Sequence, residues 1–142
     1  MILNVDGSAL TNPGKACYGG LIRKHDESFQ LGFFGSVGIS NILHAEIQAL
    51  LTSVKLCWDA GYRKLICYSD SLHAVQLIMK ETTKFHHYAN ILELIRMYLA
   101  KDWSISIHHI IREGNFRAGI LAKIWELTVQ TILLLSMNLF IV

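Results

Sequence analysis

The sequence has few charged residues, few cysteines and no segment typical of a targeting signal. Only 17% of its 142 residues are charged and 52% are hydrophobic. This composition excludes a disordered chain and predicts a single domain with a substantial core. The formal net charge of +2 neither requires nor excludes a nucleic-acid partner, so composition alone does not assign a function.

The three cysteines, Cys17, Cys57 and Cys67, are widely spaced, and none belongs to a C-x-x-C pair. Their odd number and spacing argue against a disulfide framework and against a thiolate metal or redox site. We therefore expect buried free thiols in an intracellular protein, in the reducing environment of the nucleus or the cytoplasm. The N-terminus lacks a basic region followed by a long apolar stretch, so no secretory signal is predicted.

The two ends of the chain leave separate questions open. Met1 directly precedes the first apolar run, which is consistent with a piece trimmed from a longer chain. Leu127–Val142 carries no charge over its sixteen residues, but it contains several polar residues and is shorter than the roughly 20 apolar residues of a spanning helix. A terminal packing helix is the favoured interpretation and a tail anchor the alternative, so we do not expect membrane association.

Hydrophobic patterning predicts an α/β protein, with a mixed sheet covered by helices. The expected strands are Ile2–Val5, Cys17–Lys24, Ser28–Gly35, Lys64–Ser69 and Trp103–Ile111. The expected helices are Leu43–Ala60, a short one after Ser71, Phe85–Lys101 and one from Phe116. No repeat or interdomain linker interrupts this order.

Local signals refine several of these elements. Ser40 or Asn41 is expected to cap the first helix. The pair Gly19-Gly20 indicates a bulge or a close backbone approach, of which a simple strand irregularity is favoured. His86 and His87 are expected at the surface and not as a metal pair, because adjacent helical side chains diverge by about 100°.

Three acidic residues occupy positions where carboxylates can converge. Asp6 ends the first strand, Glu46 lies in the first turn of the first long helix, and Asp70 ends the strand Lys64–Ser69. Taken alone, Glu46 fits a surface residue that complements the helix dipole better than an inward-facing one. If the two strands are neighbours, however, the carboxylates meet where open α/β sheets bind ligands. Such a cluster suits hard divalent cations, and two of them can clamp a phosphodiester.

The sequence around these acids is distinctive. Four motifs occur in order: DGSALTNPG at Asp6–Gly14, NILHAEIQAL at Asn41–Leu50, YSDS at Tyr68–Ser71, and REGN at Arg112–Asn115 followed by LAK at Leu121–Lys123. With these motifs the chain resembles the type 1 ribonuclease H family, most closely the RNase H-like (reverse transcriptase-like) domains of plant non-LTR retrotransposons and their host-encoded relatives. The resemblance implies an RNase H-like domain over residues 1–123 and an apolar tail without an assigned role over residues 124–142.

The resemblance also implies a fold and an activity. The fold is a three-layer α/β one, with a five-stranded mixed sheet flanked by helices on both sides. The activity is endonucleolytic hydrolysis of the RNA strand of an RNA–DNA hybrid by a monomer, with two Mg2+ ions, or Mn2+, as cofactors. Asp6, Glu46 and Asp70 would be the catalytic metal ligands. The residues expected to face the nucleic acid are Gly7, Ser8, Asn12, Ser71 and Asn115. An amide such as that of Asn12 can both donate to and accept from a 2′-hydroxyl.

The chain departs from the family pattern in two places. Gly119 stands where the closing motif carries a fourth acid, so weaker metal binding and slower turnover are expected. The short link Met79–Phe85 leaves no room for the basic helical insert of cellular members, which predicts weak and salt-sensitive substrate binding. A catalytically inactive nucleic-acid-binding retroelement remnant is therefore the alternative function. A structural or tail-anchored α/β protein is a third, less favoured possibility.

Overall fold

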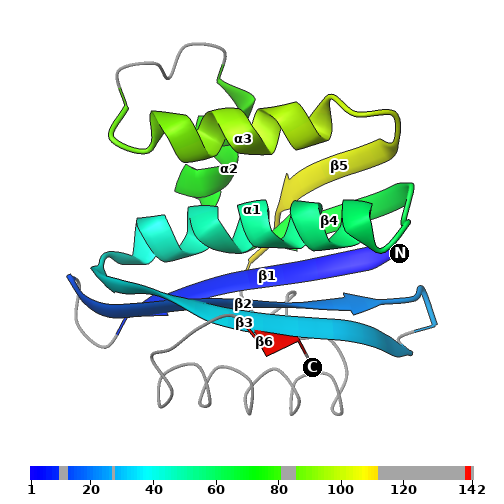
Figure 1. The fold of residues 1–142 in the computed structure, drawn as a ribbon, viewed down its shortest axis with the longest axis horizontal. Coiled ribbons are helices and arrows are strands. Elements are labelled where there is room, and N and C mark those ends of the chain that lie inside the picture. Colours follow the sequence, from blue (N-terminus) through cyan, green and yellow to red (C-terminus); the bar gives the residue numbers. More distant parts are fainter. Residues whose placement is uncertain (10–12, 27, 81–85, 112–139, 142) are drawn as a thin grey trace.

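The computed structural model describes residues 1–9, 13–26, 28–80, 86–111 and 140–141 (Figure 1). In chain order its elements are β1 (Ile2–Ala9), β2 (Gly14–Arg23), β3 (Phe29–Ser40), α1 (Ile42–Asp59), β4 (Lys64–Ser69), α2 (Leu72–Met79), α3 (Ala89–Leu99), β5 (Ser104–His109) and β6 (Phe140–Ile141). The five strands and three helices predicted within these residues are all present, which confirms the α/β class.

The strands form one mixed sheet in the order β5-β4-β1-β2-β3-β6. The first three strands make an antiparallel meander, whereas β4 and β5 are added in parallel on the other side of β1. This arrangement places β1 in the interior of the sheet, between β2 and β4. It confirms the predicted five-stranded mixed sheet and makes the strands that carry Asp6 and Asp70 direct neighbours.

The sixth strand was not predicted. Phe140 and Ile141 pair antiparallel with Phe34 and Phe33 of β3. A packing helix is therefore the wrong prediction for these two residues, because their backbone instead satisfies hydrogen bonds at the open edge of β3. The rest of the stretch Leu127–Val142 lies outside the described residues.

The described helices lie together on one side of the sheet (Figure 1). Helix α1 packs across β1, β2 and β3, α3 packs on α1, and α2 contacts α1, α3 and β5. The helix predicted from Phe116 lies outside the described residues. Within the part of the chain that the structure describes, no helix is both long and apolar enough to cross a membrane.

The core forms between α1 and the sheet. Its fully buried side chains include Leu3 and Val5 of β1, Leu50 of α1 and Leu92 of α3. The three cysteines are buried free thiols, as predicted. Burial raises the pKa of Cys57 to about 12, which makes this thiol inert near neutral pH.

Several predicted boundaries are wrong. The third strand does not end at Gly35, because β3 continues to pair with the first residues of β2 as far as Ser40. The first strand does not end at Asp6, because residues 7–9 continue to pair with β2 after the pairing with β4 has stopped at Val5. Helix α3 begins at Ala89 and not at Phe85, since His86, His87 and Tyr88 form a turn in which the Tyr88 amide donates to His86 Nδ1 at 3.1 Å.

The glycine pair of β2 is not an irregularity. Pairing with β1 and β3 is continuous at Gly19 and Gly20, and the register shifts of β2 and β3 lie elsewhere. A Cβ added to Gly20 would collide with the ring of Phe33, which is fully buried. The missing side chain therefore leaves space for the ring of a core phenylalanine, so the favoured prediction of a strand irregularity was wrong.

Candidate metal centre

Asp6, Glu46 and Asp70 form the carboxylate cluster that the sequence predicts. One carboxylate oxygen from each residue lies within 4.8 Å of the other two. The parallel pairing explains two of the three positions, because Val5 is opposite Ser69 and the residues that follow them in the chain are Asp6 and Asp70. Adjacent strands lie about 4.8 Å apart, so these carboxylates meet at one level of the sheet.

Glu46 reaches the cluster because α1 rests on β1 at Gly7. A Cβ built at Gly7 would lie 2.6 Å from the backbone nitrogen of Glu46 and 2.7 Å from the carbonyl carbon of Ala45. Only glycine permits this contact between backbones. Glu46 is 4% exposed, so its interpretation as a surface residue is wrong. Spacing along the helix does not reveal that the first turn lies against a strand.

The start of α1 is fixed by its cap. Asn41 accepts a hydrogen bond from the His44 backbone amide at 2.8 Å, which decides between the two cap residues considered above. Ser40 instead contacts the His44 ring, with 2.8 Å between Oγ and Nδ1. The side chain of Asn41 also contacts Tyr88, a partner that lies 47 positions away and that no signal in the sequence indicates.

The cluster is electrostatically unfavourable without a cation. Burial, followed by the negative charges of Asp6 and Asp70, raises the pKa of Glu46 to about 10, and a hydrogen bond with Asp6 acts in the same direction. The Gly7 amide, which donates to Asp6 Oδ1 at 2.9 Å, partly opposes this shift. Glu46 Oε2 is buried and has no hydrogen-bond partner. A buried carboxylate oxygen without a partner is costly, and a divalent cation is a suitable partner for it.

The other predicted site residues are only partly described. Ser8 is partly buried in β1, directly after Gly7. Ser71 follows Asp70 and caps α2, since its Oγ accepts from the Ala74 amide at 3.2 Å. Asn12, Asn115 and Gly119 lie outside the described residues.

The sheet order and the carboxylate cluster define a ribonuclease H-like fold, and solved structures share it. The ribonuclease H1 of the archaeon Halobacterium salinarum superposes with a TM-score of 0.72 at 23% identity, over 84% of this chain and 92% of that one. The compost-derived LC11-RNase H1, solved in complex with an RNA/DNA hybrid, gives 0.65 at 24% identity, over 84% and 91%. Identities this low establish the fold alone.

The chain belongs to the Reverse transcriptase-like family, whose model matches residues 4–124. A candidate ribonuclease H protein of Arabidopsis thaliana is 28% identical over 121 residues, which cover 85% of this chain. The matched part is 20% of that protein, so the chain spans about a fifth of the length of this curated relative. The predicted resemblance is thereby confirmed.

The pKa of Glu46 predicts how stability varies with pH in the metal-free protein. In the folded chain Glu46 stays protonated up to about pH 10, whereas in the unfolded chain it ionises near 4.5. Between these values the folded state binds more protons at this residue, so raising the pH lowers the free energy of unfolding. The contribution is at most about 1.4 kcal/mol per pH unit. Urea unfolding in chelator from pH 5.5 to 8.5 measures it.

The Glu46→Gln variant removes this titration, so it should gain stability relative to the wild type as the pH rises. Glu93→Gln is the matched control, because Glu93 is an exposed glutamate on α3. Parallel pH curves for the wild type and Glu46→Gln would contradict the assignment.

The backbone contact at Gly7 gives a second prediction. Gly7→Ala should lower the free energy of unfolding by about 1–3 kcal/mol, because the new methyl group meets backbone atoms that cannot rotate away. Gly32→Ala is the control, since its nearest neighbour is the flexible end of the Leu21 side chain at 3.2 Å. Equal losses in the two variants would show that α1 moves away from Gly7 at little cost.

Proposed function

We propose that this chain is a metal-dependent endonuclease that hydrolyses the RNA strand of RNA–DNA hybrids. The observation that carries the proposal is the convergence of Asp6, Glu46 and Asp70 around a buried, unpartnered Glu46 oxygen. The family match and the ribonuclease H name of the Arabidopsis thaliana relative support the reaction. The hybrid in the LC11-RNase H1 complex supports the substrate.

The donor set fits hard divalent cations. Asp6, Glu46 and Asp70 offer only carboxylate oxygens, the ligand type that Mg2+ and Mn2+ prefer. Two such ions, when bound, would supply an activated water and stabilise the charge on the leaving oxygen. Among these ligands Glu46 has to lose its proton, since its pKa is raised in the metal-free site.

The chain's own residues hold the ligands in place. The β1–β4 pairing keeps Asp6 and Asp70 at one level, and the Gly7 amide orients Asp6 through Oδ1. Ser71 fixes the turn after Asp70 by capping α2. Gly7, Ser8 and Ser71 therefore lie in sequence next to the ligands, where substrate contacts are expected. The contact of Asn12 with a 2′-hydroxyl, which the resemblance implies, would select RNA over DNA without reading sequence. Asn115 would also face the nucleic acid.

In this proposal the residue at position 119 determines how fast the RNA strand is cleaved. Two Mg2+ ions bring four positive charges, and three carboxylates with one scissile phosphate return four negative ones. A fourth acid would hold both ions before the substrate arrives, whereas Gly119 leaves the second ion dependent on the phosphate. The same glycine favours the second candidate function, a catalytically inactive nucleic-acid-binding remnant of a retroelement.

A hybrid-cleavage assay tests the proposal. With a labelled RNA–DNA hybrid in Mg2+ or Mn2+, the wild type should cleave the RNA slowly and leave a 3′-hydroxyl and a 5′-phosphate. Asp70→Asn should abolish cleavage, because it removes a ligand charge. Gly119→Asp should raise the rate about tenfold or more, equivalent to at least about 1.4 kcal/mol of barrier.

Asp59→Asn is the matched control for the charge change. Asp59 is an exposed residue at the last position of α1, thirteen residues or about 20 Å along the helix from Glu46. Its substitution should leave cleavage unchanged. If neither the wild type nor Gly119→Asp cleaves the hybrid, the enzyme proposal is wrong, and hybrid binding by these same proteins would favour the inactive remnant.

A further inference from the structure

Tyr88, the residue immediately before α3, contacts the first turn of α1. The Asn41 side-chain amide donates to the Tyr88 hydroxyl at 2.8 Å. The ring of Tyr88 stacks on that of His44, with 4.9 Å between centroids and 18° between planes. One side chain at the start of α3 thus contacts both the cap residue of α1 and a residue of its first turn.

Asn41 couples these contacts to the helix backbone. Its Oδ1 accepts from the His44 amide at 2.8 Å while its Nδ2 donates to Tyr88, so both ends of the side chain are used. Ser40 also restrains the His44 ring, since its Oγ lies 2.8 Å from Nδ1. A movement of Tyr88 would therefore be transmitted to the N–H groups that begin α1.

Tyr88 is itself held in place by two histidines. Its amide donates to His86 Nδ1 at 3.1 Å, and the His87 ring packs edge-on at 4.9 Å. Both histidines therefore restrain the position of Tyr88.

The opposite side of the same turn lies against Gly7. The Glu46 nitrogen and the Ala45 carbonyl carbon leave no space for a Cβ there. The first turn is therefore enclosed between β1 at Gly7 and Tyr88 of the α3 turn. Because Glu46 directly follows this turn in α1, both contacts determine where its carboxylate lies.

We propose that Tyr88 is a positioning residue for Glu46 and thereby sets the divalent-cation affinity of the carboxylate cluster. The inference rests on the proposed function, in which Glu46 is a metal ligand. Tyr88 acts through Asn41 and His44 and does not touch the cluster itself. Groups that orient metal ligands change metal affinity by about 10- to 100-fold when removed. Tyr88 acts through other residues and not directly on a ligand, so changes of about tenfold or less are expected.

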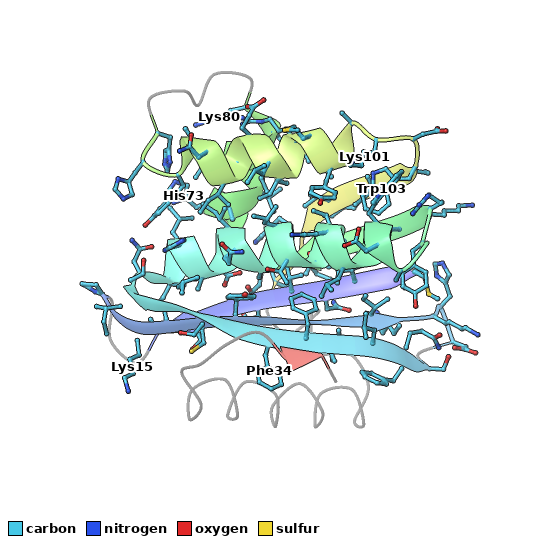
Figure 2. The ribbon with its side chains drawn as sticks, in the orientation of Figure 1. Lys15, Phe34, His73, Lys80, Lys101 and Trp103 are labelled. Atoms are coloured by element: carbon cyan, nitrogen blue, oxygen red, sulfur yellow. The ribbon has the colours of Figure 1, made fainter. Side chains whose placement is uncertain are left out.

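Matched variants separate positioning from general packing. Tyr88→Phe removes only the hydroxyl, whereas Tyr88→Leu also removes the stacked ring. Asn41→Ser keeps a good helix cap but cannot bridge to Tyr88. Tyr98→Phe and Tyr98→Leu are the controls, because Tyr98 is a partly buried tyrosine near the other end of α3 whose ring neighbours Lys101. Figure 2 shows Lys101 and Trp103 at the end of the molecule where α1 finishes.

The experiment measures Mn2+ binding to each full-length variant by calorimetry, alongside thermal unfolding and hybrid cleavage as a function of Mg2+ concentration. Tyr88→Phe should raise the Mn2+ dissociation constant about threefold and Tyr88→Leu about tenfold. Asn41→Ser should raise the Mn2+ dissociation constant by the same factor as Tyr88→Phe. The double variant should show no larger rise, since both substitutions break the same contact. The Mg2+ concentration for half-maximal cleavage should rise in parallel, with little change in the rate at saturating Mg2+.

The outcomes distinguish this inference from the proposed function. If Tyr88→Leu and Tyr98→Leu change Mn2+ affinity equally, or if Tyr88 variants lose only thermal stability, Tyr88 is a packing residue and the inference is wrong. If the wild type binds Mn2+ in a manner that Asp70→Asn does not weaken, the proposed metal site is wrong and the inference falls with it. If the hybrid is not cleaved but the Tyr88 and Tyr98 variants differ in Mn2+ affinity as expected, the positioning role stands while the enzyme proposal fails.

Discussion

The backbone of α1 rests directly on β1 at Gly7, and the candidate site depends on this contact. It brings the first turn of the helix close enough to the sheet for Glu46 to lie beside Asp6 and Asp70. Any side chain at position 7 would separate the two elements and remove the third carboxylate from the cluster. The core packing of α1 on β1, β2 and β3 keeps the helix pressed against this point. The glycine is thus a structural requirement of the site, in addition to any contact with substrate.

Three buried or partly buried acids lie so close together that their negative charges create a local electrostatic conflict within an otherwise well-packed fold. The metal-free protein resolves it by keeping Glu46 protonated, at the cost of a buried carboxylate oxygen with no hydrogen-bond partner. Such conflicts concentrate at functional sites, where a ligand supplies the missing charge. A divalent cation satisfies the oxygen and the charge together. This is why the arrangement supports phosphoryl chemistry better than a purely structural role.

The solved ribonuclease H1 structures share this fold at 24% identity or less. In this chain the site depends on local supports, since Tyr88 contacts the first turn of α1 through Asn41 and His44. Gly119 stands where the family resemblance predicts an acid. A chain can therefore retain this fold without retaining every residue of the metal site, because core packing tolerates substitutions that metal coordination does not.

The sequence by itself determined the α/β class, the five main strands, the three described helices and the identity of the three acids. Each of these follows from local information: apolar periodicity and short motifs around Asp6, Glu46 and Asp70. Only the tertiary structure decided that β1 continues past Asp6, that Glu46 points inward, and that Phe140 and Ile141 add a strand to β3. These features depend on contacts between residues far apart in the chain. The contact of Asn41 with Tyr88 is of the same kind, since a hydrogen bond across 47 positions leaves no periodic or local pattern in the sequence.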